Sequence, residues 1–180
     1  MYKGPQRKFK RRTPKRRRGS SLSEYGLQLQ EKQKLRKLYG IREKKLKRYF
    51  RQASHKRGNL VSEFVRLLEG RLDNVVFRLG FAVSRAQARQ LVNHGHILVN
   101  QKKVNIPSFE VKTGDVVSIA PRSKDLPLFK HLKTSLKSRK VPSWLKLKLD
   151  ALEGKVVTDP CFEDFQEPVD ISLVVEYYSR

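Results

Sequence analysis

Several kinds of residue are scarce in this chain, and each scarcity excludes a class of protein. A single cysteine, Cys161, excludes an internal disulfide framework and a cysteine-based zinc site. No run comes near the roughly 18 consecutive apolar residues of a membrane-spanning helix. No glycine-rich loop stands before a Lys-Ser or Lys-Thr pair, so the chain lacks the signature of a loop that binds nucleotide phosphates.

Acidic residues are absent from two long stretches. Residues 1–23 contain ten Lys or Arg and no acid, and residues 74–109 contain no Asp or Glu. In the whole chain of 180 residues, 41 Lys and Arg stand against 17 Asp and Glu, which makes the formal net charge +24. Nucleic acid is the commonest partner that neutralises such a charge, and we expect one here. An anionic membrane is the alternative, which neither an apolar span nor a lipidation signal supports.

The chain offers no constellation of residues that suits catalysis. His94 and His96 are two residues apart and could share a metal ion, but no Cys, Asp or Glu stands nearby, so contact with RNA is the favoured role. Three aspartates stand at expected helix starts or turns and do not form a carboxylate pair: Asp73, Asp115 and Asp150. We therefore expect a protein that is not an enzyme and that needs no cofactor and no metal.

The first 20 residues form a basic arm. Glycine and proline interrupt any helix there, and a block of like charge is expected to be disordered alone and to order along a phosphate backbone. An organelle transit peptide is the alternative, but the arm lacks the amphipathic period of such a peptide.

Apolar residues at helical spacing predict four helices in the first half of the chain. The first is expected over residues 28–39, with a capping box at Ser21-Leu-Ser-Glu24 and an end at Gly40. The others are expected over about 42–56, from Asn59 onward, and from Leu72 to Leu79 with a stop at Gly80.

A capped basic helix followed by a basic hairpin is expected over residues 84–106. Ser84 suits the N-cap and Gln87 completes a capping box, while Gly95 ends the helix. After it we expect a strand at 97–99, a turn at 100–103 and a returning strand at 104–106.

Two arginines of this helix should repel each other. Arg85 and Arg89 stand at i and i+4 on one polar arc. Because no acid occurs between residues 74 and 109, the segment itself cannot relieve the repulsion, but an anion from outside it could.

The second half of the chain predicts mainly strands. We expect a strand at 116–120, a short basic helix through Phe129, Leu132 and Leu136, a half-buried strand at 145–149, and a partner strand at 156–157 across Gly154. The last segment, 159–180, is acidic and predicts a short helix, with a strand as the alternative. Its charge should face another protein rather than RNA, although a plain solvated face stays open.

Four stretches resemble one family. SRAQARQLV at 84–92, HGHILVN at 94–100 and the stretches 71–81 and 106–108 resemble the RNA-binding module of bacterial-type small ribosomal subunit protein number four. The same module occurs in some pseudouridine synthases and in a class of tyrosyl-tRNA synthetases. Residues 22–40 and the C-terminal end also resemble the ribosomal family, so the resemblance runs from about residue 20 to residue 180.

The resemblance implies an α+β fold. A helical domain built from N- and C-terminal segments would accompany a central module of two short helices packed on a small, mostly antiparallel sheet. The expected division is the arm (1–20), the helical domain (21–80, completed by 159–180), the RNA-binding module (71–119) and a helix and strands that complete the second domain (120–158).

The resemblance also implies a function and partners. It implies a structural constituent of the ribosome that binds small-subunit ribosomal RNA at a multi-helix junction, nucleates subunit assembly and contributes to translational accuracy. The implied neighbours are small-subunit protein number five, other small-subunit proteins and the messenger RNA entry path, with no membrane and no homo-oligomer. A cytoplasmic ribosome is expected, and an organellar one stays open.

Binding is expected to be mostly electrostatic, with selectivity from RNA shape and exposed bases. Arginines suit phosphates and guanine edges, and amides suit bases and 2′-hydroxyls. The residues expected to contact RNA are Arg16, Arg17, Arg18, Lys44, Lys45, Arg48, Arg71, Ser84, Arg85, Gln87, Arg89, Gln90, Asn93, His94, His96, Asn100, Lys102 and Lys103.

Three features depart from the family. Many members have a longer N-terminal segment, some with four zinc-binding cysteines, and this chain has none there, so no zinc is expected. The family often has glycine after the hairpin asparagine, where this chain has Gln101, and glycine tolerates a positive φ more readily. The turn type is therefore open. Residues 122–139 match only loosely.

Other classes of protein share part of this pattern. A free-standing RNA chaperone or stalled-ribosome factor would carry the module but should lack the helical motif at 22–40. An RNA-modifying enzyme would need a catalytic acid and a large additional domain, for which 180 residues leave no space. A DNA-binding protein would use similar residues, but the chain has no helix-turn-helix signature and no evident dimer interface.

Overall fold

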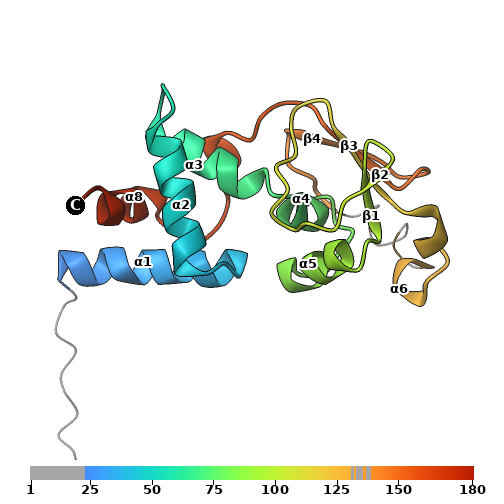
Figure 1. Cartoon of the computed structure of the whole chain (residues 1–180), viewed down its shortest axis with the longest axis horizontal. Helices are drawn as coiled ribbons and strands as arrows, with labels where there is room; N and C mark the ends of the chain where they lie inside the picture. Colours follow the sequence, from blue (N-terminus) through green and yellow to red (C-terminus); the bar gives the residue numbers. More distant parts are fainter. Residues whose placement is uncertain (1–22, 131, 133–135, 137–138) are drawn as a thin grey trace, which may run out of the picture.

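The elements form two lobes side by side along the long axis of the molecule (Figure 1). The computed structural model describes residues 23–180 except 131, 133–135 and 137–138. The helical lobe contains α1 (Glu24–Tyr39), α2 (Glu43–Ser54), α3 (Leu60–Glu69) and the C-terminal α8 (Ile171–Ser179). The sheet lobe contains α4 (Leu72–Arg78), α5 (Arg85–Asn93), α6 (Pro127–Lys130) and a five-stranded sheet. This arrangement confirms the predicted α+β fold.

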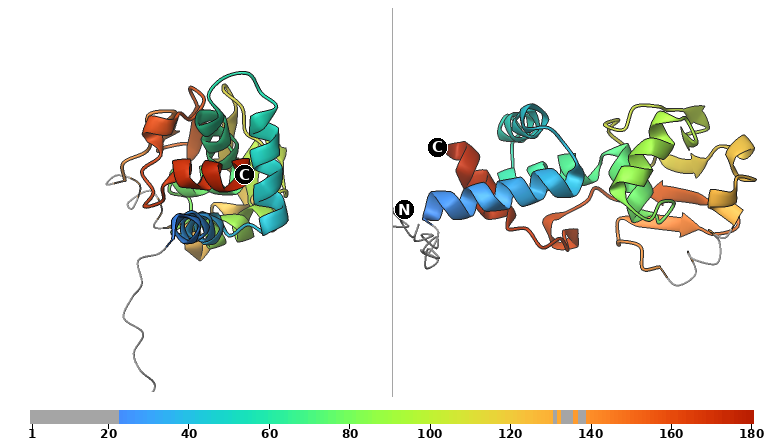
Figure 2. Two further views of the ribbon diagram at one scale, coloured as in Figure 1. Left: turned by 90° about the vertical axis from the view of Figure 1, so that its left-hand side faces the viewer. Right: turned by 90° about the horizontal axis from the view of Figure 1, so that it is seen from below.

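The two ends of the described chain meet in the helical lobe. Figure 2 shows α8 lying beside α1, and these two helices share the most extensive contact between elements. Leu35, Leu46, Phe64 and Ile171 are almost completely buried in the common core. The predicted C-terminal helix is confirmed, and the N- and C-terminal segments build one hydrophobic core.

The caps of α1 and α3 follow the sequence signals with one exception. Asn59 accepts hydrogen bonds from the backbone N–H groups of Val61 and Ser62 at the start of α3, and Gly40 ends α1 with a φ of +58°. The predicted capping box beginning at Ser21 was wrong, because α1 starts at Glu24 with Ser23 as its N-cap.

The sheet is antiparallel between every pair of neighbouring strands, in the order β2-β1-β3-β5-β4. Its strands are β1 (Ile97–Val99), β2 (Lys102–Lys103), β3 (Val116–Ile119), β4 (Leu145–Lys148) and β5 (Glu153–Val156). The leucine alternation of residues 145–149 predicted β4 correctly. Two 3₁₀ helices, η1 (Pro121–Ser123) and η2 (Phe162–Asp164), follow β3 and β5.

The hairpin between β1 and β2 is tighter than predicted. The turn contains only Asn100 and Gln101, because Val99 pairs directly with Lys102. The expected strand at 104–106 was wrong, since the return strand is β2. Both turn residues have a positive φ, +49° and +64°, which is the backbone of a type I′ hairpin turn.

Helix α4 packs against the sheet at a glycine. Gly154 lies inside β5, so the partner strand predicted at 156–157 instead spans Glu153–Val156, and the chain turns before it, where Leu152 has a φ of +54°. A Cβ atom at position 154 would lie 2.2 Å from a methyl group of Leu79. Leu79 therefore reaches the strand backbone, and α4 belongs to the core of the sheet lobe rather than to that of the helical lobe.

The predicted basic helix through residues 129–136 is only partly described. The structure gives α6 at Pro127–Lys130, and the continuation includes positions outside the described residues. Phe129, Leu132 and Leu136 are buried in the sheet-lobe core, as their spacing implied. None of the described helices is both long and apolar enough to cross a membrane.

Candidate nucleic-acid interface

Helix α5 begins with two of the expected RNA-binding residues serving as caps. Ser84 accepts a hydrogen bond from the backbone N–H of Gln87, as predicted. The side chain of Gln87 accepts one from the backbone N–H of Val83, one residue before the position that a capping box would use. Both side chains therefore define the start of the helix.

Arg85 lies at the junction of the two lobes. It donates to Asn74 Oδ1 at 2.8 Å and to Glu167 Oε1 at 2.6 Å. Its guanidinium also lies 4.8 Å from the ring centre of Tyr39 and 4.6 Å from that of Phe77. These contacts occupy the guanidinium within the protein.

Arg89 connects α5 to the end of α1. It donates twice to Asp73 Oδ2, at 3.0 and 2.8 Å, and to the backbone carbonyls of Tyr39 and Gly40 at 2.7 and 2.6 Å. The last carbonyls of a helix have no partner within it, so Arg89 caps α1 from the other lobe.

The anions that relieve the repulsion between Arg85 and Arg89 come from the same chain. An anion from outside the acid-free stretch does relieve it, but the source is the protein itself: Asp73 stands just before the stretch, and Glu167 belongs to the C-terminal segment. Tertiary packing brings both carboxylates to α5. Glu167 also pairs with Arg78 at 3.0 Å, so this acid of the C-terminal segment is used inside the protein.

Arg71 is buried rather than presented to solvent. It forms a two-point pair with Asp73, at 3.0 and 2.6 Å, and donates to the hydroxyl of Tyr49 at 2.8 Å. Burial opposes its charge, but Asp73 and Tyr49 hold the pKa of the guanidinium above its ordinary value. In this structure the guanidinium of Arg71 therefore links the sheet lobe to Tyr49 of the helical lobe.

Glu69 is the buried acid at the centre of the same junction. It accepts from Arg78 at 2.8 and 2.9 Å, from Asn74 at 2.9 Å and from the hydroxyl of Tyr39. Burial opposes ionisation of the carboxyl group, but these partners, Arg78 first, hold its pKa below the ordinary value of 4.5. The buried polar groups at the junction are thus matched with one another.

Four basic or imidazole side chains surround a hollow beside the hairpin. We call it the hairpin hollow; His94, His96, Lys103 and Arg122 line it, and its volume is about 450 Å³. Among the described residues that line it, none is acidic. Three of the four were predicted to contact RNA, and the fold brings them together.

Local geometry holds these side chains in place. Gly95 has a φ of +73°, and a Cβ atom there would lie 1.9 Å from Cε of Lys103, so the lysine stem crosses directly over the glycine. On the other side, Nδ1 of His96 lies 2.9 Å from Oγ of Ser123, which follows Arg122 in η1. The hairpin and the end of β3 therefore shape one surface.

Arg122 was not predicted from the sequence. It stands in the stretch that resembles the family only loosely, and a lone arginine in a loop carries no pattern. The available signal was its position just after β3, because β3 pairs with β1, the strand that follows His96. Using this signal required knowing that two strands far apart in the sequence pair with each other.

The remaining residues predicted to contact RNA on the sheet lobe are of two kinds: some have exposed side chains, and one is used for hydrogen bonds within the protein. Gln90, Asn93 and Lys102 are exposed. Asn100 instead holds the hairpin, donating to Asp115 Oδ1 at 2.8 Å and accepting from the backbone N–H of Val116 at 2.9 Å.

The basic residues of α2 lie on the helical lobe. Lys44 and Arg48 are exposed, and Lys45 is half-buried with its Nζ 3.4 Å from Oγ of Ser108. Burial, with Arg48 and Arg71 nearby, lowers the pKa of Lys45. The arginines at 16, 17 and 18 lie outside the described residues.

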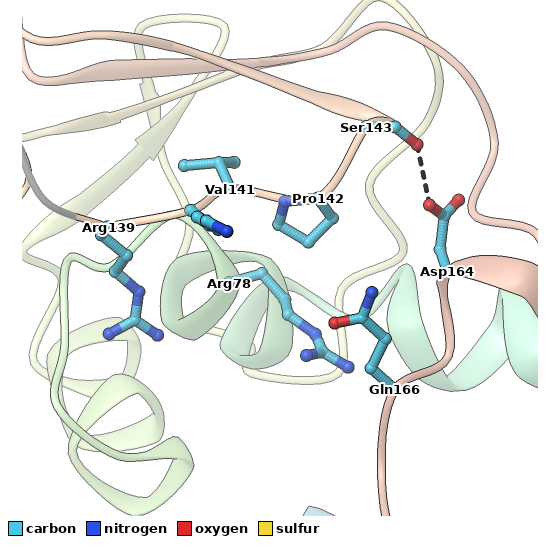
Figure 3. A pocket seen from close by; sticks show the side chains of 8 residues that line it. Arg78, Arg139, Val141, Pro142, Ser143, Asp164 and Gln166 are labelled. Atoms are coloured by element: carbon cyan, nitrogen blue, oxygen red, sulfur yellow. Dashed lines mark hydrogen bonds between the residues drawn. The ribbon is translucent and has the colours of Figure 1, made fainter.

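A second hollow lies near the junction of the lobes and has mixed charge. Figure 3 shows Arg78, Arg139 and Gln166 around it, with the hydroxyl of Ser143 donating to Asp164 at 2.7 Å. Its volume is about 340 Å³. Because a carboxylate lines it and Arg78 is already paired, it matches a phosphate backbone less well than the hairpin hollow does.

The described residues contain no group of three or more His, Cys, Asp or Glu side chains placed to hold a metal ion. His94 and His96 lie with ring centres 6.0 Å apart and have no acidic companion in the lining of the hairpin hollow. The site is basic and hydrogen-bonding in character.

Comparison with known families matches two adjoining parts of the chain. The family described as Ribosomal protein S4/S9 N-terminal domain matches residues 2–69, and the family described as S4 domain matches residues 70–117. The boundary between the two matches falls where the helical-lobe core gives way to the sheet-lobe core.

Whole-chain relatives are similar over most of their length. Small ribosomal subunit protein uS4 of Natranaerobius thermophilus is 51% identical over 163 residues, which are 91% of this chain and 78% of that protein. The proteins of the same name from Thermus thermophilus and Aquifex aeolicus are 50% and 51% identical, over 88% and 91% of this chain and 76% and 79% of their own lengths.

Proposed function

Because this chain belongs to the small ribosomal subunit protein uS4 family, we propose that it binds small-subunit ribosomal RNA with the hairpin hollow as a principal contact. The chain is a structural, non-enzymatic constituent of the ribosome that binds ribosomal RNA. The observation that carries the proposed site is the convergence of His94, His96, Lys103 and Arg122 without an acidic neighbour in the lining.

The chemistry of the hollow suits RNA. Lys103 and Arg122 supply positive charge for phosphate oxygens, and the two imidazoles can donate to phosphates or to base edges. The exposed amides of Gln90 and Asn93 lie on the helix that leads into the hollow and can reach bases or 2′-hydroxyls. Arg71, Arg85 and Arg89 take a different part in this proposal, since they hold the lobes together.

The test is RNA binding across a salt series. The variant Lys103→Gln/Arg122→Gln should bind small-subunit ribosomal RNA with a log–log salt slope shallower by about 1.4–1.8, or 0.7–0.9 for each lost phosphate contact. Filter binding with transfer RNA and duplex DNA as competitors measures slope and selectivity together. The wild-type protein should prefer the ribosomal RNA.

A matched control removes the same charge elsewhere. Lys34 and Lys56 pair with Glu31 at 2.5 Å and Glu63 at 3.4 Å on the helical lobe. The variant Lys34→Gln/Lys56→Gln should keep the wild-type slope to within about 0.5. Equal changes in the two double variants, with unchanged thermal unfolding, would show that only net charge matters and would overturn the proposed site.

Finer roles are also proposed from the family resemblance. They are binding at a multi-helix junction that nucleates assembly, a place in translational accuracy, contact with small-subunit protein number five, and messenger RNA near Arg16, Arg17 and Arg18 on a cytoplasmic ribosome. The exposed acid Glu163 supports a protein contact, although Glu167 is used internally. Cross-linking from position 163 in assembled subunits tests this, and cross-links to RNA alone would refute it.

A further inference from the structure

The two faces of the sheet can be assigned from one contact and the strand register. Gly154 lies against Leu79 of α4, so its neighbours across the sheet, Val117 and Leu147, face the helices as well. Successive residues of a strand point to opposite faces. Lys155, Lys146 and Lys148 therefore point to the outer face, away from α4.

Like charges oppose each other on this outer face. Lys146 and Lys155 are direct partners across β4 and β5, and both are exposed. Such a pair destabilises a sheet when nothing neutralises it. Although every acidic residue of the chain lies in its described part, neither lysine forms an ion pair there. An anion bound from outside would remove the repulsion.

A hollow with an apolar side lies between these lysines. It has a volume of about 540 Å³, and Lys146, Lys148 and Lys155 line it together with Val116 and Val157. One carboxylate, that of Glu153 opposite Lys148, also lines it, so three lysines stand against one acid and the lining stays net positive. Val157 is 45% exposed, which leaves apolar surface open beside the cations. We call it the lysine hollow. Apolar surface next to positive charge matches a nucleotide, whose base is flat and apolar on its faces and whose phosphate is anionic.

The lysine hollow and the hairpin hollow share the outer face. Lys103, Leu98, Ser118, Glu153 and Lys148 are successive partners across all five strands and form one transverse row. Lys103 belongs to the hairpin hollow at one end of the row, and Lys148 to the lysine hollow at the other. Four strand spacings separate the two ends by about 19 Å.

We propose that the lysine hollow holds an unpaired nucleotide of the same ribosomal RNA, with its phosphates on Lys146 and Lys155 and its base against Val116 and Val157. This inference rests on the proposed function and extends its footprint across the outer face of the sheet. The RNA strand would thus be held at two points on the outer face of the sheet, the hairpin hollow and the lysine hollow.

The test neutralises the opposed pair. Lys146→Gln/Lys155→Gln should make the log–log salt slope for ribosomal RNA shallower by about 1.4, or 0.7 for each single-strand phosphate contact. The variant should unfold at the wild-type temperature or higher, because it also removes a repulsion. The variant Lys146→Arg/Lys155→Arg should keep the wild-type salt slope, since it keeps both positive charges.

The controls separate this inference from the proposed function. Lys34→Gln/Lys56→Gln removes the same charge from pairs on the helical lobe and should leave the slope unchanged. A photo-cross-linking residue at Val157 should attach to an unpaired nucleotide of the ribosomal RNA, and excess mononucleotide should not prevent it. Mononucleotide that does prevent it would indicate a free-nucleotide site and overturn the inference.

Two further results have distinct meanings. A wild-type protein that binds ribosomal RNA selectively while the Lys146→Gln/Lys155→Gln variant keeps the wild-type slope would overturn the lysine hollow alone. A wild-type protein that does not distinguish ribosomal RNA from duplex DNA would overturn the proposed function as well.

Discussion

Gln101 occupies a backbone conformation that glycine adopts with less strain. Its φ of +64° lies in the left-handed region, next to Asn100 at +49°. Asparagine tolerates this region better than most residues, and the amide of Asn100 is also held by a hydrogen bond to Asp115. Glutamine has no such compensation, so the turn stores strain at one residue while the strands around it keep their register.

Replacing Gln101 with glycine should stabilise the protein. Relief of left-handed strain is worth about 1–2 kcal/mol, and the added freedom of the unfolded chain offsets about 0.4–1 kcal/mol of it. A net gain of about 0.5–1 kcal/mol in the free energy of unfolding is expected from urea titration. Gln101→Val should destabilise instead, because a β-branched residue fits this region poorly; equal midpoints for the two variants would contradict the strain argument.

At the scale of elements, the end of α4 packs the side chain of Leu79 directly onto the backbone of β5 at Gly154. Leu79 occupies the space that a side chain at Gly154 would need, and Val117 and Leu147 flank the glycine on neighbouring strands. Close packing of this kind leaves little room for adjustment. The contact therefore fixes the distance between the helix layer and the sheet.

Gly154→Ala should destabilise the sheet lobe by about 1–3 kcal/mol, as overpacking does in well-packed cores. The cause is a Cβ atom 2.2 Å from a methyl group of Leu79. Calorimetry should show a lower unfolding temperature. When Leu79 is already alanine, Gly154→Ala should lower the free energy of unfolding by less than it does in the wild-type background. Purely additive effects of Leu79→Ala and Gly154→Ala would refute the steric explanation.

At the scale of the whole molecule, a buried polar network joins the two lobes. Arg89 caps α1 from α5, Arg85 reaches Glu167, and Arg71 joins Asp73 to Tyr49. Removing one member would leave its partners buried without hydrogen bonds. The free-energy cost of those unpaired groups is larger than the net stabilisation that the pair provides. In the proposed function, these arginines therefore act on RNA binding only through the relative placement of the two lobes.

The network should make stability depend on pH. The pKa of Glu69 is held below 4.5, so its contribution to stability is complete above pH 4.5 and is lost as the pH falls through the lower native value. Glu69→Gln should cost about 3 kcal/mol at pH 7, since it breaks a buried pair. The difference from wild type in urea unfolding should narrow at pH 3.

An exposed acid provides the comparison for this prediction. Glu110 pairs with Arg66 at 2.9 Å while its side chain is 46% exposed, so Glu110→Gln should cost less than about 1 kcal/mol at pH 7. A Glu69→Gln penalty that stayed constant from pH 7 to pH 3 would show that the lost contribution is packing rather than charge.

Much of the local structure was determined by the sequence itself. Asn59, Ser84, Gly40 and Gly95 each mark a helix end through hydrogen bonds or backbone freedom that need only nearby residues. The alternation of Leu145 to Leu149 likewise predicts a strand from short-range spacing. Charge composition indicated a polyanion, because net charge is a sum that needs no fold.

The roles of the individual arginines were decided only by the tertiary structure. In sequence, Arg85 and Arg89 stand in a stretch without acids, and Glu167 is more than 70 residues away. Packing of the lobes brings that carboxylate to Arg85 and leaves Lys103 and Arg122 facing solvent around the hairpin hollow. A residue is free to bind a ligand only if folding gives it no better partner, and which residues meet is a property of long-range contacts.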